Sequence, residues 1–244
     1  MFSAPQRTKS PSVLEKVVTR IFLRPVYVAS VSVLSPGFRH IELAGASLCG
    51  IGWSPGDKLQ VKMDGGLASR SYTPINWDAA IGRAELVCYC RGWGPGRDWV
   101  RTVKPDEALH VFGPRASIEI PVNQPVVLFG DETSVALALA CQSAHTLSSL
   151  HTILEVSDAD DIETMRGRLG LGLTELFPRQ EGDAHLKAVV ETLLRAGGVG
   201  NATFLLTGKA SSIQTVMRAL KASGIDSKRI RSKAYWATGK AGLD

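Results

Sequence analysis

Three side chains within four consecutive residues, Arg70, Tyr72 and Thr73, combine chemistries that suit one kind of ligand. Arginine presents a rigid planar fork that matches a pyrophosphate, and tyrosine presents a flat ring that stacks on a planar heterocycle. Threonine adds a hydroxyl that both donates and accepts hydrogen bonds. A dinucleotide with a flat, redox-active head needs all three close together, and FAD is such a molecule. The segment 70–73, Ser71 included, is therefore predicted to bind FAD. Taken alone, Tyr72 is equally well explained as a strand aromatic with its hydroxyl at the rim.

Short β-rich runs separated by turn residues surround this segment. Ser-Pro-Gly at 35–37 and Pro-Gly-Asp at 55–57 are turn signals. Six short strands with regular turns predict an antiparallel barrel that ends near Pro121, so residues 23–122 are expected to form a six-stranded FAD-binding β-barrel domain. Residues 1–22 are expected to form a polar tail and a short helix, because residues 11–23 have helical apolar spacing. The predicted strands are 26–34, 38–43, 58–63, 70–76, 84–91 and 108–112.

The pattern changes after residue 122, where strand-like and helix-like runs alternate. The compact apolar run 126–129 is closed by a glycine and followed by an alanine-rich helical stretch at 134–144. Such alternation predicts a doubly wound parallel sheet, so residues 123–244 are expected to form an α/β domain of the NAD(P)H-binding kind. Two domains leave a cleft, and small ligands bind in such clefts. The other predicted elements are strands at 151–156, 203–207 and 231–236 and helices at 186–195 and 211–222.

Composition and charge narrow the function classes. The chain has 244 residues, of which 44% are hydrophobic and 21% are charged, as in globular proteins. Its net charge of +5 favours anionic ligands, but no nucleic-acid-binding motif accompanies it, and the basic stretch at 228–233 is equally well explained as a solvated face. No apolar run approaches the ~20 residues that span a bilayer, and the N-terminus lacks the apolar core of a secretory signal. A cytoplasmic protein without stable membrane insertion is expected.

The cysteines offer no metal centre. None forms Cys-x-x-Cys, and no Cys/His cluster has the spacing of a zinc or iron–sulfur site. Cys88 and Cys90 would share one face of a strand, which leaves a redox pair conceivable, but small buried hydrophobic residues are the favoured interpretation.

The order of barrel, Arg-x-Tyr-Thr motif and α/β domain resembles that of the ferredoxin-reductase-like flavoproteins. Within that superfamily the chain most resembles the siderophore-interacting proteins, the FAD-dependent ferric-siderophore reductases, from about residue 25 to residue 239. The matching segments, in chain order, are Pro55-Gly56-Asp57, Arg70-Ser71-Tyr72-Thr73, Gly92 with Gly94-Pro95 and Trp99, Gly113-Pro114-Arg115, Gly130-Asp131-Glu132-Thr133, and Tyr235-Trp236 with Gly239.

The resemblance implies roles for residues on both sides of the expected cleft. Arg70 would hold the FAD diphosphate, Tyr72 would pack on the isoalloxazine and Thr73 would bond its edge. Trp236 would close the far face of the flavin, with a core tryptophan as the competing interpretation. The remaining residues expected to bind the cofactor are Arg91, Gly92, Gly96, Trp99, Asp131, Thr133 and Ser134.

Four positions depart from the family pattern. Arg91 stands where the family usually has a histidine, and an arginine can still meet a phosphate. Pro74-Ile75 follow the flavin motif where another basic residue is common. Gly96 replaces an alanine, which is expected to loosen that loop. Lys209 replaces a glutamate and reverses a charge where a nicotinamide nucleotide or an anionic substrate would lie.

The start of the α/β domain is a poor phosphate cradle. Asp131 and Glu132 occupy the positive end of the predicted helix and would repel a pyrophosphate, so a capped helix competes evenly with a nucleotide site. Lys209 follows a strand at the edge where open α/β sheets bind ligands, although a solvent-exposed lysine at a helix start explains it as well. The residues predicted to meet NADPH, NADH or an anionic substrate are Lys209, Arg218, Arg231, Lys233 and Lys240.

These observations lead to a first hypothesis of an FAD-dependent oxidoreductase. Electrons from NADPH, NADH or a ferredoxin would pass through the flavin to a ferric siderophore, and Fe(II) would be released. No catalytic residue is expected beyond the flavin itself. A flavin-dependent reductase of another acceptor, such as free flavin, a quinone or a partner protein, is the alternative. A non-catalytic module that binds a flavin or an iron chelate is a third interpretation.

Overall fold

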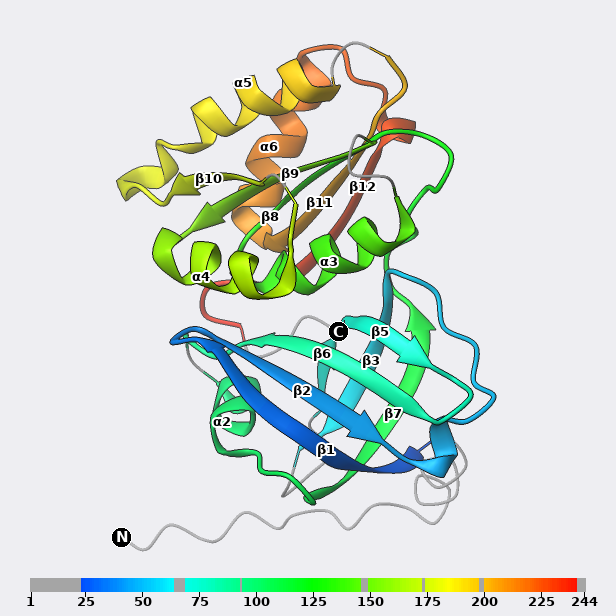
Figure 1. Ribbon diagram of the computed structural model, residues 1–244. Coiled ribbons are helices and arrows are strands. Elements are labelled where there is room, and N and C mark those ends of the chain that lie inside the picture. Colours follow the sequence, from blue (N-terminus) through cyan, green and yellow to red (C-terminus); the bar gives the residue numbers. More distant parts are fainter. Residues whose placement is uncertain are drawn as a thin grey trace, which may run out of the picture.

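The computed structural model describes residues 23–63, 69–92, 94–145, 149–172, 174–197 and 200–240. Two β-sheets, one from each half of the chain, lie one above the other (Figure 1). The tail and short helix expected over residues 1–22 lie outside the described residues. No helix in the described part of the chain is both long and apolar enough to cross a bilayer.

The first half forms a seven-stranded antiparallel sheet with the order β4-β3-β7-β1-β2-β6-β5. Apolar and polar residues alternate along its strands, as in β2, where buried Ile41 and Leu43 flank the polar Glu42. The buried side chains pack into one apolar cluster, as in a barrel. The elements of this half are β1 (Leu23–Ser35), β2 (Phe38–Ala44), η1 (Ala46–Leu48), β3 (Asp57–Lys62), β4 (Ser69–Tyr72), β5 (Pro74–Asp78), β6 (Arg83–Tyr89), α2 (Pro95–Thr102) and β7 (Ala108–Ala116).

The antiparallel architecture is confirmed, but the sheet has seven strands where the sequence predicts six. The run predicted as one strand at 70–76 is divided, because β4 pairs with β3 whereas β5 pairs with β6. The chain changes partner at Thr73, just before Pro74, whose nitrogen cannot donate a ladder hydrogen bond. The Arg-x-Tyr-Thr motif therefore turns a corner of the sheet instead of following one strand.

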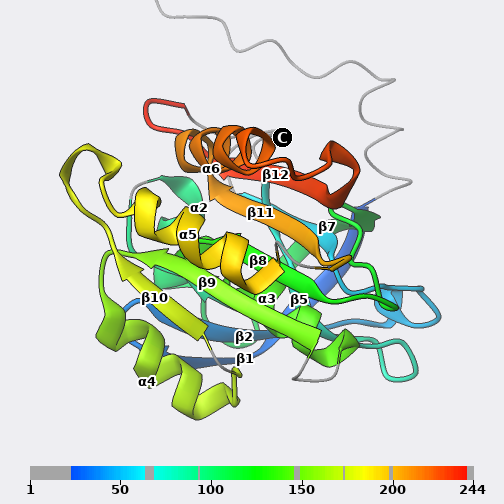
Figure 2. The same cartoon turned by 90° about the horizontal axis from the view of Figure 1, so that it is seen from above.

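The second half forms a five-stranded parallel sheet with the order β10-β9-β8-β11-β12, so the predicted doubly wound architecture is confirmed. Helices α3 and α4 lie on the face toward the first sheet, and α5 and α6 cover the other face (Figures 1 and 2). The elements are β8 (Val126–Gly130), η2 (Glu132–Ser134), α3 (Val135–Ala144), β9 (Leu150–Val156), α4 (Ala159–Leu169), β10 (Thr174–Pro178), η4 (Glu181–Asp183), α5 (Leu186–Gly197), β11 (Thr203–Lys209), α6 (Ala210–Ala222), η5 (Ser227–Arg229) and β12 (Ile230–Trp236).

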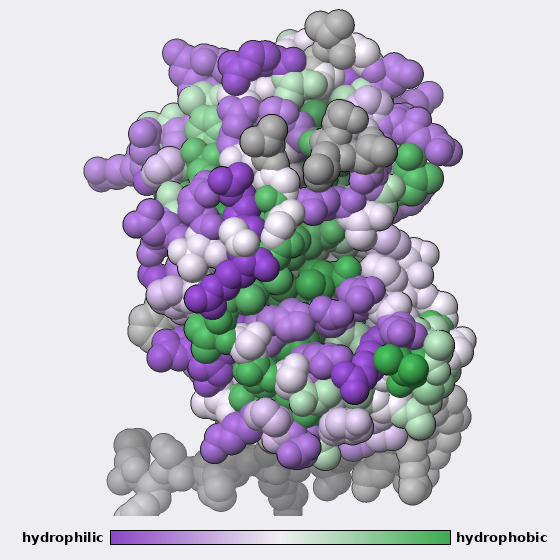
Figure 3. All heavy atoms as spheres, in the orientation of Figure 1, coloured by the Kyte–Doolittle hydropathy of each residue, from purple (hydrophilic) through white to green (hydrophobic). Residues whose placement is uncertain are grey.

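A single apolar cluster joins the two halves. It combines Leu34, Phe38 and Val87 of the first sheet with residues of β8, α3 and α4. Ile118 and Ile120, in the connection between the sheets, belong to the same cluster. Apolar surface gathers in the middle of the face shown in Figure 3, at the level where the halves meet. Because burying apolar area is the main favourable contribution to packing, the relative position of the sheets is strongly constrained.

Ion pairs reinforce this contact at the start of α4. Arg91, just after β6, places Nε 2.8 Å from Asp161 Oδ2 and a terminal nitrogen 3.2 Å from Asp158 Oδ2. The backbone N–H of Gly37 donates to the other oxygen of Asp161 at 3.0 Å. Asp158 caps α4 by accepting from the N–H of Asp161. The buried Asp161 carboxylate therefore contacts two groups, Arg91 and the Gly37 N–H, that bring the first sheet against α4.

Replacing Arg91 with alanine is expected to lower the free energy of unfolding by about 1–2 kcal/mol, because Asp161 then loses the cation that pairs with it while it stays buried. Urea denaturation followed by circular dichroism measures this. The Arg91→Ala, Asp161→Asn double variant should recover part of the loss, since the neutral amide can still accept from Gly37. Arg218→Ala, on an exposed face of α6, is the matched control, and an equal loss in that variant would contradict the role given to Arg91.

Candidate functional site

Tyr72 lies at the end of β4 with its ring half-buried against α2. Its ring centroid is 5.2 Å from that of Trp99, at an interplanar angle of 49°. Its hydroxyl donates to the backbone oxygen of Gly96 at 3.2 Å. Burial raises the pKa of Tyr72 well above its ordinary value, so the hydroxyl stays protonated at neutral pH. The sequence-predicted residues Tyr72, Gly96 and Trp99 are thus brought together at one place.

The start of α2 beside Arg70 is open and uncapped. Gly94, the N-cap residue, makes no side-chain capping bond, and Pro95 occupies the first turn. The first N–H groups of a helix have no partner inside the helix and, with the helix dipole, favour an anion. A β-carbon placed on Gly92 or Gly94 would meet nothing within 4 Å, so there is free space beside both glycines. This combination suits the diphosphate of a dinucleotide.

Gly96 brings α2 close to the flavin motif. A β-carbon at this position would lie 3.2 Å from both Arg70 Cγ and the Tyr72 hydroxyl. The glycine was expected to loosen its loop, yet here its missing side chain permits the close contact between α2 and β4. The indole nitrogen of the neighbouring Trp99 is buried and has no hydrogen-bond partner in the described part of the chain. A buried donor without a partner is uncommon, and a polar ligand atom would satisfy it.

Tyr235 of β12 connects the corner of the first sheet to the second sheet. Its hydroxyl forms side-chain hydrogen bonds with Thr73 and with Thr207 of β11. Thr207 in turn donates to the Ser134 hydroxyl at 2.8 Å. Burial raises the pKa of Tyr235, so this hydroxyl also stays protonated. A line of hydroxyl groups therefore runs from the flavin motif into the start of α3.

Asp131, directly after β8, is fully buried at the centre of the second half of the site. Its Oδ1 accepts from the N–H of Thr133 at 2.8 Å and also from the Thr133 hydroxyl. Its Oδ2 accepts from the indole N–H of Trp236 at 2.7 Å. Burial raises the pKa of Asp131 to about 6, although these hydrogen bonds and Arg179 favour the charged form. Ser134 completes a capping box with Asp131, so its hydroxyl is already used.

The carboxyl edge of the parallel sheet is filled with paired charges. Arg179, just after β10, holds Glu132 with two hydrogen bonds of 2.9 and 2.7 Å. Behind it, buried Glu155 lies 2.8 Å from the Nε2 atom of His185. Lys209, at the end of β11, pairs with Asp183 at 2.9 Å. A nucleotide phosphate placed at this edge would have to compete with carboxylates for Arg179 and Lys209.

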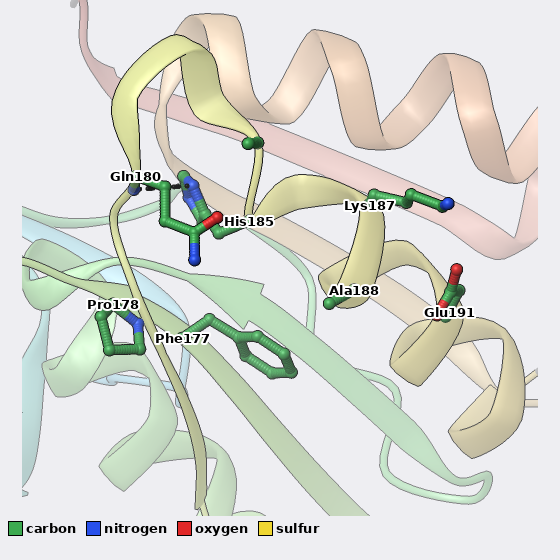
Figure 4. A pocket seen from close by; sticks show the side chains of 8 residues that line it. Phe177, Pro178, Gln180, His185, Lys187, Ala188 and Glu191 are labelled. Atoms are coloured by element: carbon green, nitrogen blue, oxygen red, sulfur yellow. Dashed lines mark hydrogen bonds between the residues drawn. The ribbon is translucent and has the colours of Figure 1, made fainter.

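A shallow pocket of about 330 Å³ lies farther along the same edge, between β10 and α5. Figure 4 shows His185 and Gln180 at its rim, with Lys187 and Glu191 along α5. None of the residues predicted from the sequence lines it. The pocket is therefore separate from the group around Tyr72.

The structure does not bring all the predicted residues together. Arg91 is paired with Asp158 and Asp161, so its guanidinium supports the contact between the halves. Arg218 lies on α6, about 13 Å along the helix from Lys209 at 1.5 Å per residue. Arg231 is the second residue of β12, at the opposite end of the strand from Trp236, and contacts Glu119. Lys240 is exposed beyond β12, and Ser71 is exposed between Arg70 and Tyr72.

Arg179 and the role of Tyr235 are the features that the sequence did not identify. Arg179 follows β10, a strand that was not predicted because its five residues lack a clear alternating pattern. Tyr235 was noted only as part of a family match, and nothing in the sequence places it against Thr73, 162 residues earlier.

Cys88, Cys90 and Cys141 are buried free thiols, and burial raises the pKa of Cys141 to about 12, which agrees with a packing role. No cluster of His, Cys, Asp and Glu suited to a metal occurs among the residues that could be described.

Comparison with known proteins agrees with this fold. Residues 123–239 match the family model described as siderophore-interacting protein. The NADPH-dependent ferric-chelate reductase of Escherichia coli (strain K12) is 24% identical over 251 residues, which cover 93% of this chain and 98% of the relative.

Solved structures extend the likeness over the whole described chain. A siderophore utilization protein from T. fusca superposes with a TM-score of 0.71 at 21% identity, covering 91% of this chain and 95% of the other. A siderophore-interacting protein from Aeromonas hydrophila gives a TM-score of 0.72 at 19% identity, covering 90% and 93%. The ferredoxin reductase of carbazole 1,9a-dioxygenase gives 0.68 at 15% identity, covering 87% and 68%. The chain therefore has the ferredoxin-reductase-like fold, and its second half matches the siderophore-interacting protein family.

Proposed function

We propose that the protein is an FAD-dependent reductase of ferric siderophores, with electrons from NADPH, NADH or a ferredoxin. The observation that supports this most strongly is the open, uncapped start of α2 beside Arg70 and Tyr72, at a corner of the sheet where Thr73 meets Tyr235. The activity of the Escherichia coli relative points in the same direction. The cytoplasmic location expected from the sequence remains a prediction.

The chain's own residues would bind and orient the cofactor. Arg70 and the first N–H groups of α2 would hold the diphosphate, and Trp99 would offer its unpartnered indole N–H nearby. Tyr72 and Trp236 would flank the flavin head, with Thr73 at its edge. FAD, when bound, supplies the redox chemistry, accepting electrons in pairs from a nucleotide and passing them singly to Fe(III). Fe(II) is held less tightly than Fe(III) by hard oxygen ligands, so reduction favours release of the metal.

The electron donor would meet a crowded edge of the parallel sheet. Arg179 and Lys209 are the cations there, and each is already paired with a carboxylate. The NADPH dependence of the Escherichia coli relative favours a pyridine nucleotide. A nucleotide phosphate would replace Asp183, in the short η4 segment, as the partner of Lys209 more readily than it would replace Glu132 as the partner of Arg179. Arg179 and Glu132 are joined by two hydrogen bonds, which makes that pair the stronger one. A donor that binds the surface, such as a ferredoxin, would not need either exchange.

The first test is an anaerobic visible spectrum of the protein loaded with FAD, before and after NADPH and then a ferric siderophore. Bleaching by NADPH and recovery of colour with the iron complex are expected. Because NADPH carries two electrons and each Fe(III) accepts one, an Fe(II) trap should collect two ions for each NADPH oxidised. Protein that stays colourless after incubation with FAD would exclude the proposal. Bleaching followed by recovery with a quinone but not with the ferric complex would identify a different acceptor.

Arg70→Ala is expected to weaken FAD binding by roughly tenfold to a hundredfold, because a charged hydrogen bond to the diphosphate is lost. Titration of apoprotein with FAD, followed by quenching of flavin fluorescence, gives the dissociation constant. Arg70→Lys should retain part of the affinity, since it keeps the charge without the planar fork. Arg195→Ala, exposed at the end of α5, controls for lost positive charge, and equal weakening there would contradict a specific role for Arg70.

Lys233→Glu is expected to raise the KM for an anionic ferric chelate by on the order of fivefold and to change that for a neutral chelate much less. Lys233 lies two residues before Tyr235 on β12, about 7 Å away along the strand, and is therefore a cation close to the contact between Tyr235 and Thr73. Initial rates with chelates of both kinds measure this. Lys221→Glu, exposed on α6, is the charge control, and equal effects of Lys233→Glu on both chelates would exclude a charged landing surface here.

A further inference from the structure

A bulge in β12 directs two neighbouring aromatic side chains to one place. Gly208 of β11 pairs with Ala234, and the next residue, Lys209, pairs with Trp236, so Tyr235 has no residue opposite it. Consecutive side chains of a regular strand point to opposite faces, and an extra residue breaks that alternation. As a result Tyr235 reaches Thr73 and Thr207, while the adjacent Trp236 reaches Asp131.

Asp131 is held tightly in the position from which it contacts Trp236. A β-carbon at Gly208 would lie 2.5 Å from Asp131 Oδ2, so only glycine leaves room for the carboxylate beside β11. The Thr133 N–H fixes the other oxygen at 2.8 Å. The 2.7 Å contact with the Trp236 indole is therefore made by a rigidly placed acceptor. Such a short bond from N–H to a carboxylate is among the stronger hydrogen bonds in proteins.

We propose that Asp131 is a positioning residue that holds the indole of Trp236 at the flavin site, and that protonation of its carboxyl group weakens this hold. The proposal rests on the proposed function for the identity of the ligand that Trp236 would cover. The link between Asp131 and Trp236 can be tested without that ligand. An aromatic ring tethered at its N–H keeps its plane fixed, whereas an untethered ring at the end of an edge strand can turn.

Several charged and titratable groups surround Asp131. Glu132 lies next to it and raises its proton affinity, whereas Arg179 lies 3.8 Å from its Oδ2 and lowers it. Tyr235 of β12 approaches from the side of the first sheet. Behind Arg179 are Glu155 of β9 and His185 at the start of α5, and Lys209 with Asp183 ends β11. Tyr89 of β6 faces Glu132 and Arg179.

The pH range of the effect follows from burial. Since burial raises the pKa of Asp131 to about 6, the carboxylate is charged above that pH and neutral below it. A neutral carboxyl group accepts a weaker hydrogen bond than a carboxylate. The tether is therefore strong at pH 7.5 and weak at pH 5.

The experiment uses the full chain labelled with ¹⁵N and observes the indole N–H signals of its tryptophans by NMR. Trp236→Phe identifies the signal of residue 236. In the wild-type protein this signal is expected to move with pH about a midpoint near 6. In Asp131→Asn it should stay in one place, because the amide does not titrate in this range. Asp226→Asn, which changes a capping residue just before the start of β12 and at the opposite end of that strand from Trp236, should titrate like the wild type.

FAD affinity provides the second readout. The wild-type protein should bind FAD on the order of fivefold more weakly at pH 5 than at pH 7.5, the ratio expected between a neutral and a charged hydrogen bond. Asp131→Asn should show no such dependence, and it avoids the cavity that Asp131→Ala would leave. A signal of residue 236 that does not titrate, or that titrates equally in Asp131→Asn, would overturn the link. Titration without any pH effect on FAD affinity would overturn the positioning role. Absence of FAD binding at every pH would instead contradict the proposed function. The NMR titration would still test whether Asp131 holds the indole of Trp236.

Discussion

The apolar contact between the two sheets is the constraint on which the site depends. Leu34, Phe38 and Val87 from the first sheet share one buried cluster with β8, α3 and α4, so each half covers part of the apolar surface of the other. This shared packing, reinforced by Arg91 and Asp161, brings Thr73 within hydrogen-bonding distance of Tyr235. Small changes in the packing of α3 would therefore shift the two walls of the site relative to each other. Residues far from any ligand are thus part of its geometry.

The N-terminal ends of α2 and α3 differ in how well they can accommodate an anion, and a few side chains cause the difference. In the turn that leads into α3, Asp131 accepts from the N–H of Thr133, and both Asp131 and Glu132 place negative charge at the positive end of the helix, which Arg179 compensates. At the start of α2, glycine and proline leave the N–H groups without side-chain caps and leave open space beside them. A diphosphate is favoured at α2 and disfavoured at α3. The carboxyl edge of the parallel sheet, which in many α/β proteins binds a nucleotide, is here stabilised mainly by its own ion pairs.

The sequence was sufficient to predict the sheet types and most elements, because those depend on local alternation and turn residues. It also identified Arg70, Tyr72 and Trp99 as neighbours through a family resemblance. It did not predict that Thr73 divides one expected strand into two, since that depends on which strands lie alongside. The ion-pair partners of Arg91 and Lys209 likewise could not be predicted from the sequence. Asp161 is 70 residues from Arg91, and Asp183 is 26 from Lys209, and neither spacing carries a local signal. Side chains predicted to meet phosphates are instead neutralised by carboxylates that the fold brings to them.

The position of β12 at the edge of its sheet explains how the bulge at Tyr235 is tolerated. An edge strand has one hydrogen-bonded neighbour, so an extra residue interrupts a single ladder, whereas in β8 or β11 it would interrupt two. The bulge lets one short segment serve both walls of the site, with Tyr235 directed to the first sheet and Trp236 to Asp131. Arg231 and Lys233 alternate onto one face of β12 before the bulge, whereas Ile230 and Ala234 pack against the core on the other face, so charge on the first face can vary without altering the core. The edge strand therefore carries the aromatic rings of the candidate site at its end and a face of variable charge before them.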